Sequence, residues 1–329
     1  MQSISKTVLS LDTARTLIAA AFGPEAVISD FQELTEGFFN AAYQVTLGDG
    51  ERYVLKIAPP RHVPVLRYER SIIHAEVAAI ERVASETNVP VPQIYRFDDS
   101  GELLDVPYFI MEFLPGVPLH KVRAELTPAE QEEIDADIGR YLRQINDLAG
   151  PRFGYLAPGA SQHDSWRDAF LQIVADVLAD GEALGVSLPR PYERLSEEIA
   201  RAAGALDEVV TPQLVHWDLW DGNIFFDPES RQITGIIDFE RALWADPLME
   251  FQFRTLEEPA GFRAGYERAM LATPGQRARR VLYSLHLYLI KIIECSYRQF
   301  ETMDQENWAR EQHDQELARL DALLAGDPV

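Results

Sequence analysis

The chain contains little cysteine and shows no sign of secretion. Of its 329 residues only Cys295 is a cysteine, so no disulfide can form within the chain. There is no Asn-x-Ser/Thr acceptor for N-glycosylation, and residues 1–10 lack the long apolar core of a signal peptide. We therefore expect a cytoplasmic protein.

Long apolar runs and clusters of basic residues are also missing. The most apolar helical stretch, residues 285–293, is too short to cross a membrane and contains Lys291. The chain has 30 Lys and Arg against 53 Asp and Glu, a net charge of −23. No basic stripe offers a surface for a phosphate backbone. Both absences predict a protein that binds neither membranes nor nucleic acid, and 47% hydrophobic content is enough for buried cores.

One segment in the second half of the chain combines residues that suit phosphoryl transfer. Residues 214–223 read Leu-Val-His-Trp-Asp-Leu-Trp-Asp-Gly-Asn, and Ile-Ile-Asp-Phe-Glu follows at 236–240. Transfer of a γ-phosphoryl group needs an acceptor for the nucleophile's proton and oxygen ligands for magnesium. The pattern predicts Asp218 as the base and Asn223 and Asp238 as the metal ligands. Any one of them alone would suit ordinary turn chemistry, so the joint pattern carries the prediction.

Apolar runs on both sides of this segment explain its spacing. Residues 214–215 and 224–226 are expected as short buried strands, and 233–237 as a strand that returns after the turn at 227–230. We expect the three ligating side chains to converge from one small hairpin. His216 is expected to brace the loop by hydrogen bonding, and Trp217 to serve either as packing or as pocket wall.

The first third of the chain supplies a lysine that suits a phosphate. Residues 42–47 and 52–58, joined by Gly-Asp-Gly, predict a β-hairpin in which Lys56 lies among small apolar neighbours. A buried ammonium needs an anionic partner, unless its long side chain reaches solvent. A helix expected over 68–87 carries Glu76 at the edge of its apolar stripe, with Glu69 on a similar bearing. We prefer Glu76 as the partner.

The loop that would cover the phosphates has few glycines. No Gly-x-x-x-x-Gly-Lys-Ser/Thr sequence occurs, which excludes a Walker-type cradle. Residues 36–41 precede the hairpin where a protein kinase would carry Gly-x-Gly-x-x-Gly, but they contain a single glycine. Backbone N–H groups around Phe39, Asn40 and Ala41 are the candidates for holding phosphate, and a plain turn between strands is the alternative.

Taken together, these motifs resemble the aminoglycoside phosphotransferase and choline kinase superfamily, the small-molecule branch of the protein-kinase-like fold. The resemblance covers roughly residues 30–300, rests most firmly on the residues around Asp218, and includes Phe-Ile-Met-Glu-Phe-Leu-Pro-Gly at 109–116. The segment Trp-Asp-Leu-Trp-Asp-Gly-Asn is also similar to the catalytic loop of fructosamine kinases. The resemblance implies ATP or GTP with Mg²⁺ and transfer of a phosphoryl group to a hydroxyl group. It also implies that the backbone of Glu112 and Leu114 holds the adenine or guanine ring.

The resemblance also implies an α+β, bilobal protein-kinase-like fold. The N-terminal nucleotide-binding lobe, residues 1–113, would contain a lead helix, an antiparallel sheet and the Glu76 helix. The C-terminal lobe, residues 114–329, would be mainly helical and hold the catalytic loop and acceptor site. A capping box at Thr127-Pro128-Ala129-Glu130 begins its first helix, and further helices are expected near 165–184, 192–206 and 279–300.

The acceptor is the least determined part of the prediction. Asp-Phe-Glu in place of Asp-Phe-Gly, and the lack of an Ala-Pro-Glu segment, disfavour an atypical protein kinase. A nucleotide-binding pseudokinase is a further alternative, disfavoured because all the catalytic side chains are present. We expect an aminoglycoside-, amino alcohol- or sugar-like acceptor, and the acidic composition favours a cationic group on it. The sequence leaves open whether certain aromatic residues line its pocket or the core: Trp166, Trp217, Trp220, Trp244 and Phe253.

Overall fold

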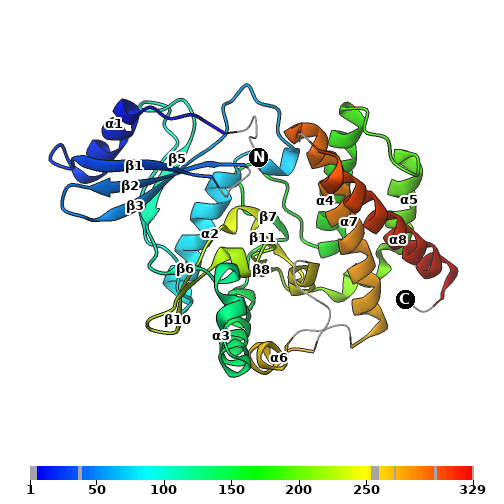
Figure 1. Ribbon diagram of the computed structural model, residues 1–329. Coiled ribbons are helices and arrows are strands. Elements are labelled where there is room, and N and C mark those ends of the chain that lie inside the picture. The colour runs from blue at the N-terminus through cyan, green and yellow to red at the C-terminus, as the bar shows by residue number, and fades with distance from the viewer. Residues whose placement is uncertain (1–5, 36–38, 253–258, 270–271, 300–301, 328–329) are drawn as a thin grey trace.

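The computed structural model describes residues 6–35, 39–252, 259–269, 272–299 and 302–327. An N-terminal part built on an antiparallel sheet lies beside a larger, mainly helical part (Figure 1). This arrangement confirms the expected α+β class. Among the described residues no helix combines the length and the apolar character that a membrane crossing requires.

The N-terminal sheet has the strand order β1-β2-β3-β5-β4, with every neighbouring pair antiparallel. Its strands are β1 (Ile28–Leu34), β2 (Ala41–Leu47), β3 (Arg52–Ile57), β4 (Ile94–Asp98) and β5 (Tyr108–Glu112). Alternation of side chains gives the sheet two apolar faces. Helix α1 (Leu11–Phe22) covers one face and α2 (Ile72–Glu86) contacts the other. Lys56 of β3 therefore faces α2, as the alternation predicted.

Helix α2 begins four residues later than expected. Residues Arg67–Glu69 form a separate 3-10 turn, and Ser71 adopts a left-handed conformation (φ 61°) that interrupts the helical path. The Glu69 carboxylate closes this turn by accepting a hydrogen bond from the Leu66 N–H at 2.9 Å. Glu69 therefore lies outside α2, while Glu76 lies within it.

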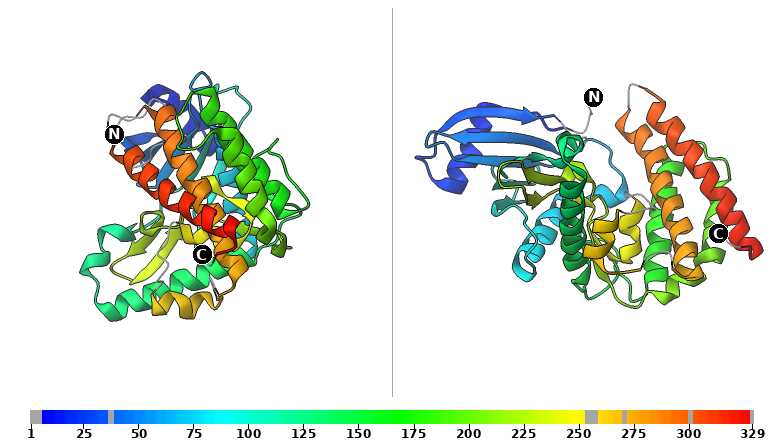
Figure 2. Two further views of the ribbon diagram at one scale, coloured as in Figure 1. Left: turned by 90° about the vertical axis from the view of Figure 1, so that its right-hand side faces the viewer. Right: turned by 60° about the horizontal axis from the view of Figure 1, so that its bottom comes forward.

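Long helices dominate the C-terminal part. They are α3 (Pro128–Asp147), α4 (Trp166–Ala183), α5 (Tyr192–Ala202), α6 (Ala260–Tyr266), α7 (Pro274–Arg298) and α8 (Asp304–Ala325). Helix α3 begins at the predicted capping box, in which Thr127 and Glu130 bond to each other's backbone N–H. Helix α7 begins earlier than expected, at a second capping box of Thr273 and Gln276. It runs through the middle of the helical part and is flanked by α4 and α8 (Figure 2).

Two small sheets support the catalytic segment. One has the order β10-β9-β6, from β6 (Val117–Pro118), β9 (Ile224–Asp227) and β10 (Gln232–Ile236). The other has the order β7-β11-β8, from β7 (Gly154–Tyr155), β8 (Gln213–Val215) and β11 (Leu243–Ala245). The expectation of a single hairpin is wrong in one respect. The β9–β10 hairpin is present, but β8, which leads into Asp218, pairs with β11 in a different sheet.

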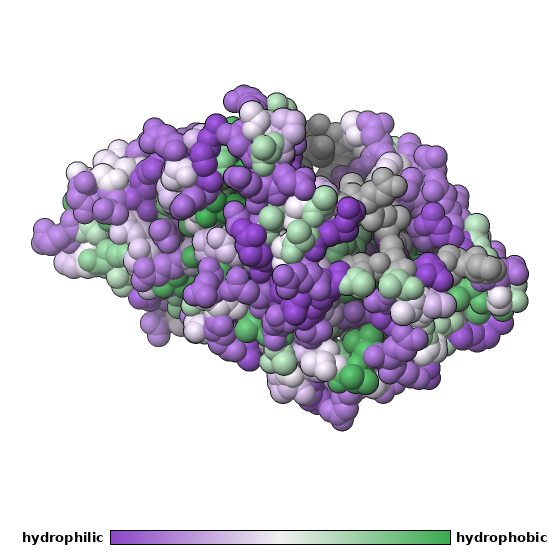
Figure 3. Space-filling model, turned by 90° about the horizontal axis from the view of Figure 1, so that it is seen from below, coloured by the Kyte–Doolittle hydropathy of each residue, from purple (hydrophilic) through white to green (hydrophobic). Residues whose placement is uncertain are grey.

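The face that carries α3 and α6 is predominantly hydrophilic (Figure 3). Helix α3 turns its apolar residues, including Ile134, Ile138 and Leu142, into the core, and most of its acidic residues stay at the surface. The acidic run at the start of α3 therefore forms a solvated helix face.

Candidate active site

A buried carboxylate holds the catalytic loop between β8 and β9. Glu250, 1% exposed, accepts hydrogen bonds from the backbone N–H groups of His216 (2.7 Å) and Trp217 (3.0 Å). Its Oε1 also accepts from Nδ2 of Asn146 at 3.1 Å. Trp217 has a left-handed backbone (φ 57°), which is unfavourable for a residue with a side chain. These bonds stabilise the sharp bend that directs Asp218 away from β8.

His216 connects this loop to the strand that ends at Asp238. Its Nε2 lies 2.9 Å from the carbonyl oxygen of Ile237, and its Nδ1 accepts a hydrogen bond from the Asp218 N–H at 3.2 Å. Burial lowers the pKa of His216 to about 4, so the ring is neutral and these two bonds place its proton on Nε2. The geometry agrees with the bracing role expected for this histidine.

Asp218 is half-buried, with charges of both signs nearby. Burial raises the pKa of Asp218 to about 7; Arg241 and Lys291 oppose this rise, whereas Asp238 and Glu240 add to it. Nδ2 of Asn223 donates to the Asp218 carbonyl oxygen at 2.8 Å. This bond fixes the Asn223 amide, and its oxygen is the atom that could ligate a metal ion.

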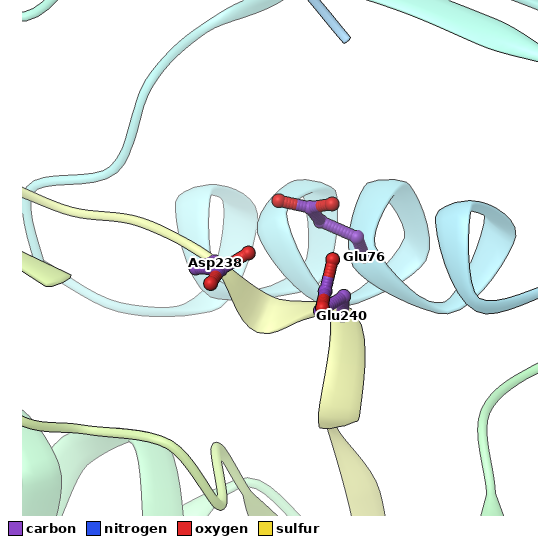
Figure 4. Close-up of side chains that lie close together, drawn as sticks. All are labelled: Glu76, Asp238 and Glu240. Atoms are coloured by element: carbon purple, nitrogen blue, oxygen red, sulfur yellow. The ribbon is translucent and has the colours of Figure 1, made fainter. Parts of the chain in front are cut away.

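Lys56 is the centre of an ion cluster with three acids, Glu76, Asp238 and Glu240, whose side chains Figure 4 shows. Its Nζ lies 2.7 Å from Glu76, 2.7 Å from Asp238 and 3.3 Å from Glu240. Burial acts to lower the pKa of Lys56, but the charges of Asp238, Glu76 and Glu240 outweigh it and hold that pKa well above its usual value. The structure thus pairs Lys56 with Glu76. The alternative, Glu69, instead forms an ion pair with Arg298.

The three acids around Lys56 carry more negative charge than one ammonium can balance. Glu76, Asp238 and Glu240 each offer an oxygen atom within 4.8 Å of the others. Burial raises the pKa of Glu76, and Asp238 and Glu240 add to this rise, because the carboxylates share a single lysine. Hard divalent cations prefer such oxygen ligands. Because Lys56 Nζ already lies among these three carboxylates, Asp238 together with the amide oxygen of Asn223 is the pair that could hold magnesium.

Glu240 is the functional candidate that the sequence reasoning missed. It stands where Asp-Phe-Gly kinases have glycine, so in the sequence it is only a departure from that pattern. Asn40 donates to Glu240 at 2.7 Å, which connects the predicted phosphate loop to the acidic cluster. The signal in the sequence that could have identified Glu240 is its position two residues after Asp238.

The other residues predicted to contact the nucleotide are Phe39, on the expected phosphate loop, and Glu112 and Leu114, at and just after the end of β5. Phe39 is buried, with the Arg298 guanidinium 4.5 Å from its ring centre, and residues 36–38 of the same loop lie outside the described residues. Glu112 ends β5, and its backbone N–H donates to the Gln93 carbonyl oxygen at 2.9 Å. Leu114 is buried two residues later, between β5 and β6.

Most of the tryptophans belong to the core. Trp166, Trp217 and Trp244 are buried, and Trp217 stacks on His286 with ring centres 5.1 Å apart. Trp220, 45% exposed, stacks on His120 at 5.3 Å beside the catalytic loop and is the one described tryptophan of the five candidates that is open to a ligand there. Phe253 lies outside the described residues.

Comparison with known families agrees with this geometry. Residues 30–283 match the sequence model of the phosphotransferase enzyme family. The chain belongs to this family. The family resemblance predicted from the motifs is thereby confirmed, and the match includes both the Lys56 cluster and the catalytic loop.

Relatives of this chain carry different names. A probable acyl-CoA dehydrogenase, IBR3, from Arabidopsis thaliana is 24% identical over 62% of this chain, and the match spans 25% of that protein. A probable ketoamine kinase from Enterococcus faecium is 22% identical over 60% of this chain and 65% of its own length. The chain thus matches about a quarter of the first relative and about two thirds of the second.

Solved structures share the fold of this chain. A putative fructosamine-3-kinase from Thermobifida fusca superposes with a TM-score of 0.65 at 18% identity, covering 95% of this chain and 100% of its own. A thermostable mutant of aminoglycoside phosphotransferase APH(4)-Ia, in complex with ADP and hygromycin B, gives a TM-score of 0.61 at 20% identity, covering 94% and 99%. At these identities the likeness concerns the fold.

Proposed function

We propose that the protein is a magnesium-dependent kinase that transfers the γ-phosphoryl group of ATP or GTP to a hydroxyl group of a small molecule. The observation that carries the proposal is Lys56, held 2.7 Å from both Glu76 and Asp238, with the Asp218 loop tied to the same strand through His216. A lysine, two metal-ligand candidates and a half-buried base are the parts that phosphoryl transfer requires.

Each part has a role in the proposed reaction. Lys56, held by Glu76, would contact the α- and β-phosphates, and backbone of Phe39 and Asn40 would cover them. Asp238 and Asn223 would hold magnesium, with Glu240 beside them. A bound magnesium ion would neutralise charge on the phosphate oxygens.

The base and the nucleotide contacts complete this assignment. Asp218, whose pKa burial raises to about 7, would accept or orient the proton of the acceptor hydroxyl. The backbone of Glu112 and Leu114 would hold adenine or guanine at the end of β5. Residues 1–113 would then form the nucleotide lobe and 114–329 the acceptor lobe, and a cytoplasmic location is part of the same proposal.

The relatives support a small-molecule acceptor. One is named a probable ketoamine kinase, and one solved structure contains ADP and the small molecule hygromycin B. The intact set of Lys56, Asp218, Asn223 and Asp238 disfavours a pseudokinase. A protein acceptor is disfavoured because no Ala-Pro-Glu segment follows Asp238.

Calorimetry and turnover separate these possibilities. MgATP and MgGTP are titrated into the protein, and ADP or GDP release is then followed with ketosamines, sugars, amino alcohols, hydroxy acids and aminoglycosides. We expect nucleotide binding and turnover that depends on one acceptor class, with turnover lost in Asp218→Asn. Transfer of label to protein would instead show a protein kinase. Binding without turnover of any acceptor would show a pseudokinase.

A further inference from the structure

Three basic side chains gather on one acid beside the catalytic loop. We name Arg241, Lys291 and Arg298 the basic cluster. Glu294 of α7 lies 3.8 Å from Arg241, 4.0 Å from Lys291 and 3.2 Å from Arg298. Lys291 and Arg298 are on α7 itself, whereas Arg241 follows Asp238 by three residues. The cluster therefore joins α7 to the segment that carries the proposed metal ligand.

The basic cluster lies next to the proposed base. The Arg241 guanidinium is 5.9 Å from the ring centres of both Trp217 and Tyr68, and Trp217 directly precedes Asp218 in the chain. Arg241 and Lys291 both act to lower the pKa of Asp218, so their charges reach its carboxylate. An acceptor whose hydroxyl approached Asp218 would lie within reach of these two cations.

The cations of the basic cluster are shared among several acids. Glu294 lies near all three, and Glu69 pairs with Arg298. Beyond these ion pairs, the charges of Asp218 and Glu240 act to raise the pKa of Arg241, and the charge of Asp218 acts to raise the pKa of Lys291. Buried cations are stabilised by anionic partners. In a chain of net charge −23, three cations beside Asp218 therefore form a local basic region that suits an anionic group on the acceptor.

Two buried donor atoms at the cluster also lack partners. Nη1 of Arg241 and the hydroxyl of Tyr155 form no hydrogen bond among the described residues. Tyr155 stacks on Tyr68 with ring centres 5.8 Å apart, and the Arg241 charge opposes the rise that burial causes in the pKa of Tyr155, so the guanidinium and the phenol lie near each other. A guanidinium and a phenol can together bind the oxygen atoms of a carboxylate or a phosphate.

We propose that the acceptor is an anionic hydroxyl compound, whose carboxylate or phosphate group is bound by Arg241, Lys291 and Tyr155 while its hydroxyl faces Asp218. This inference rests on the proposed kinase activity and narrows its substrate class. It is the opposite of the cationic acceptor that net charge suggested. Net charge sums the whole surface, whereas an acceptor contacts only the side chains beside Asp218.

Matched pairs of acceptors test the proposal. Glycerate is compared with its amide, and glucose 6-phosphate with glucose, by ADP release and by calorimetric binding in the presence of MgADP. We expect the anionic member of at least one pair to bind and react at least 10-fold better. The pair that shows the preference identifies carboxylate or phosphate as the group.

Variants connect the preference to the cluster. At a pH above the acidic limb, where Asp218 is ionised in both proteins, Lys291→Gln should lower kcat/KM for the anionic member about 10- to 100-fold, the range for a lost charge-assisted hydrogen bond, and change the neutral member less than about 3-fold. Lys6→Gln, at a surface pair with Glu33, is the matched control. Tyr155→Phe removes only a hydroxyl and should weaken binding of the same anionic compound, which keeps the test valid if Lys291→Gln does not fold.

Several outcomes would overturn the proposal while leaving the kinase assignment intact. One is MgADP binding with no preference for the anionic member of any pair. Another is an equal loss of kcat/KM for the anionic and the neutral member of a pair in Lys291→Gln, which would mean that the basic cluster acts on the transferred phosphoryl group. Failure to bind MgATP is a separate result, and it would overturn the proposed function itself.

Discussion

Replacing Glu250 with glutamine tests whether the hydrogen bonds of Glu250 hold the catalytic loop in place, separately from the reaction at Asp218. Glu250 accepts hydrogen bonds from the backbone of His216 and Trp217 and from the side chain of Asn146, none of which has a proposed contact with substrate. Glutamine has nearly the same shape, but it offers one oxygen where glutamate offers two. In the wild-type protein Oε1 serves His216 and Asn146, and Oε2 serves Trp217.

The structure sets the size of the effect. With the glutamine oxygen toward His216, its NH₂ group must face the Trp217 N–H, so a buried donor loses its partner. Such a loss costs about 1–3 kcal/mol of unfolding free energy. Trp217 holds a left-handed conformation that itself costs about 1–3 kcal/mol, so without this bond it is free to relax. A shift of about 1 Å at Asp218 would then reduce turnover on the order of 10²-fold.

Urea denaturation followed by circular dichroism measures the stability change, and ADP release with the identified acceptor measures turnover. Glu197→Gln, at an exposed position of α5, is the matched control and should behave as wild type. Glu250→Gln should keep MgATP affinity within about 3-fold, since Lys56 and Asp238 do not depend on it. Unchanged stability together with unchanged turnover would refute the supporting role of Glu250.

Three further substitutions test the proposed roles. Asp218→Asn should retain MgATP binding and lose about 10²- to 10⁴-fold in turnover, and near-normal turnover would remove its assignment as base. Asp238→Ala should abolish magnesium-dependent nucleotide affinity in calorimetry, because a principal oxygen ligand is lost; unchanged MgATP binding would contradict that role. For Lys56→Met, the loss in kcat expressed as a free energy should exceed the loss in the free energy of unfolding. Glu76→Gln should weaken the same step. If Glu69→Gln and not Glu76→Gln reproduces the defect, the pairing of Lys56 with Glu76 is wrong.

Local signals in the sequence predicted much of the fold. The Thr127 capping box and the Gly-Asp-Gly turn specify a helix start and a hairpin within a few residues, and both are where we expected them. Residues 216–223 form the loop between two short strands that the flanking apolar runs predicted. The capping box of Thr273 and Gln276 was equally readable and would have given the correct start of α7.

The features that the sequence did not reveal depend on contacts between distant segments. Glu250 is recognisable only once it lies against a loop more than thirty residues earlier, and nothing near it in the chain marks this role. Glu240 is recognisable as part of the site only through its ion pair with Lys56 and its hydrogen bond from Asn40, both in the N-terminal part of the molecule. The pairing of β8 with β11 was equally hidden, since a three-residue strand carries no signal for its partner.

Asp218 lies between two groups of charges whose effects on its pKa are opposite. Asp238 and Glu240 act to raise it, and Arg241 and Lys291 act to lower it. The base works as a carboxylate, so turnover should fall as pH drops through a value near 7. An anionic acceptor would offset the charges of Arg241 and Lys291 and thereby raise the pKa of Asp218 in the complex.

The acidic limb of the kcat profile should therefore lie at higher pH for an anionic acceptor than for its neutral analogue. Lys291→Gln should move the limb upward for the neutral analogue as well, because it removes one of the two cations. Profiles measured for both acceptors, with wild-type protein and with this variant, provide the check. Identical limbs in all four profiles would show that these cations do not act on the base, and the charge argument for an anionic acceptor would lose its electrostatic support.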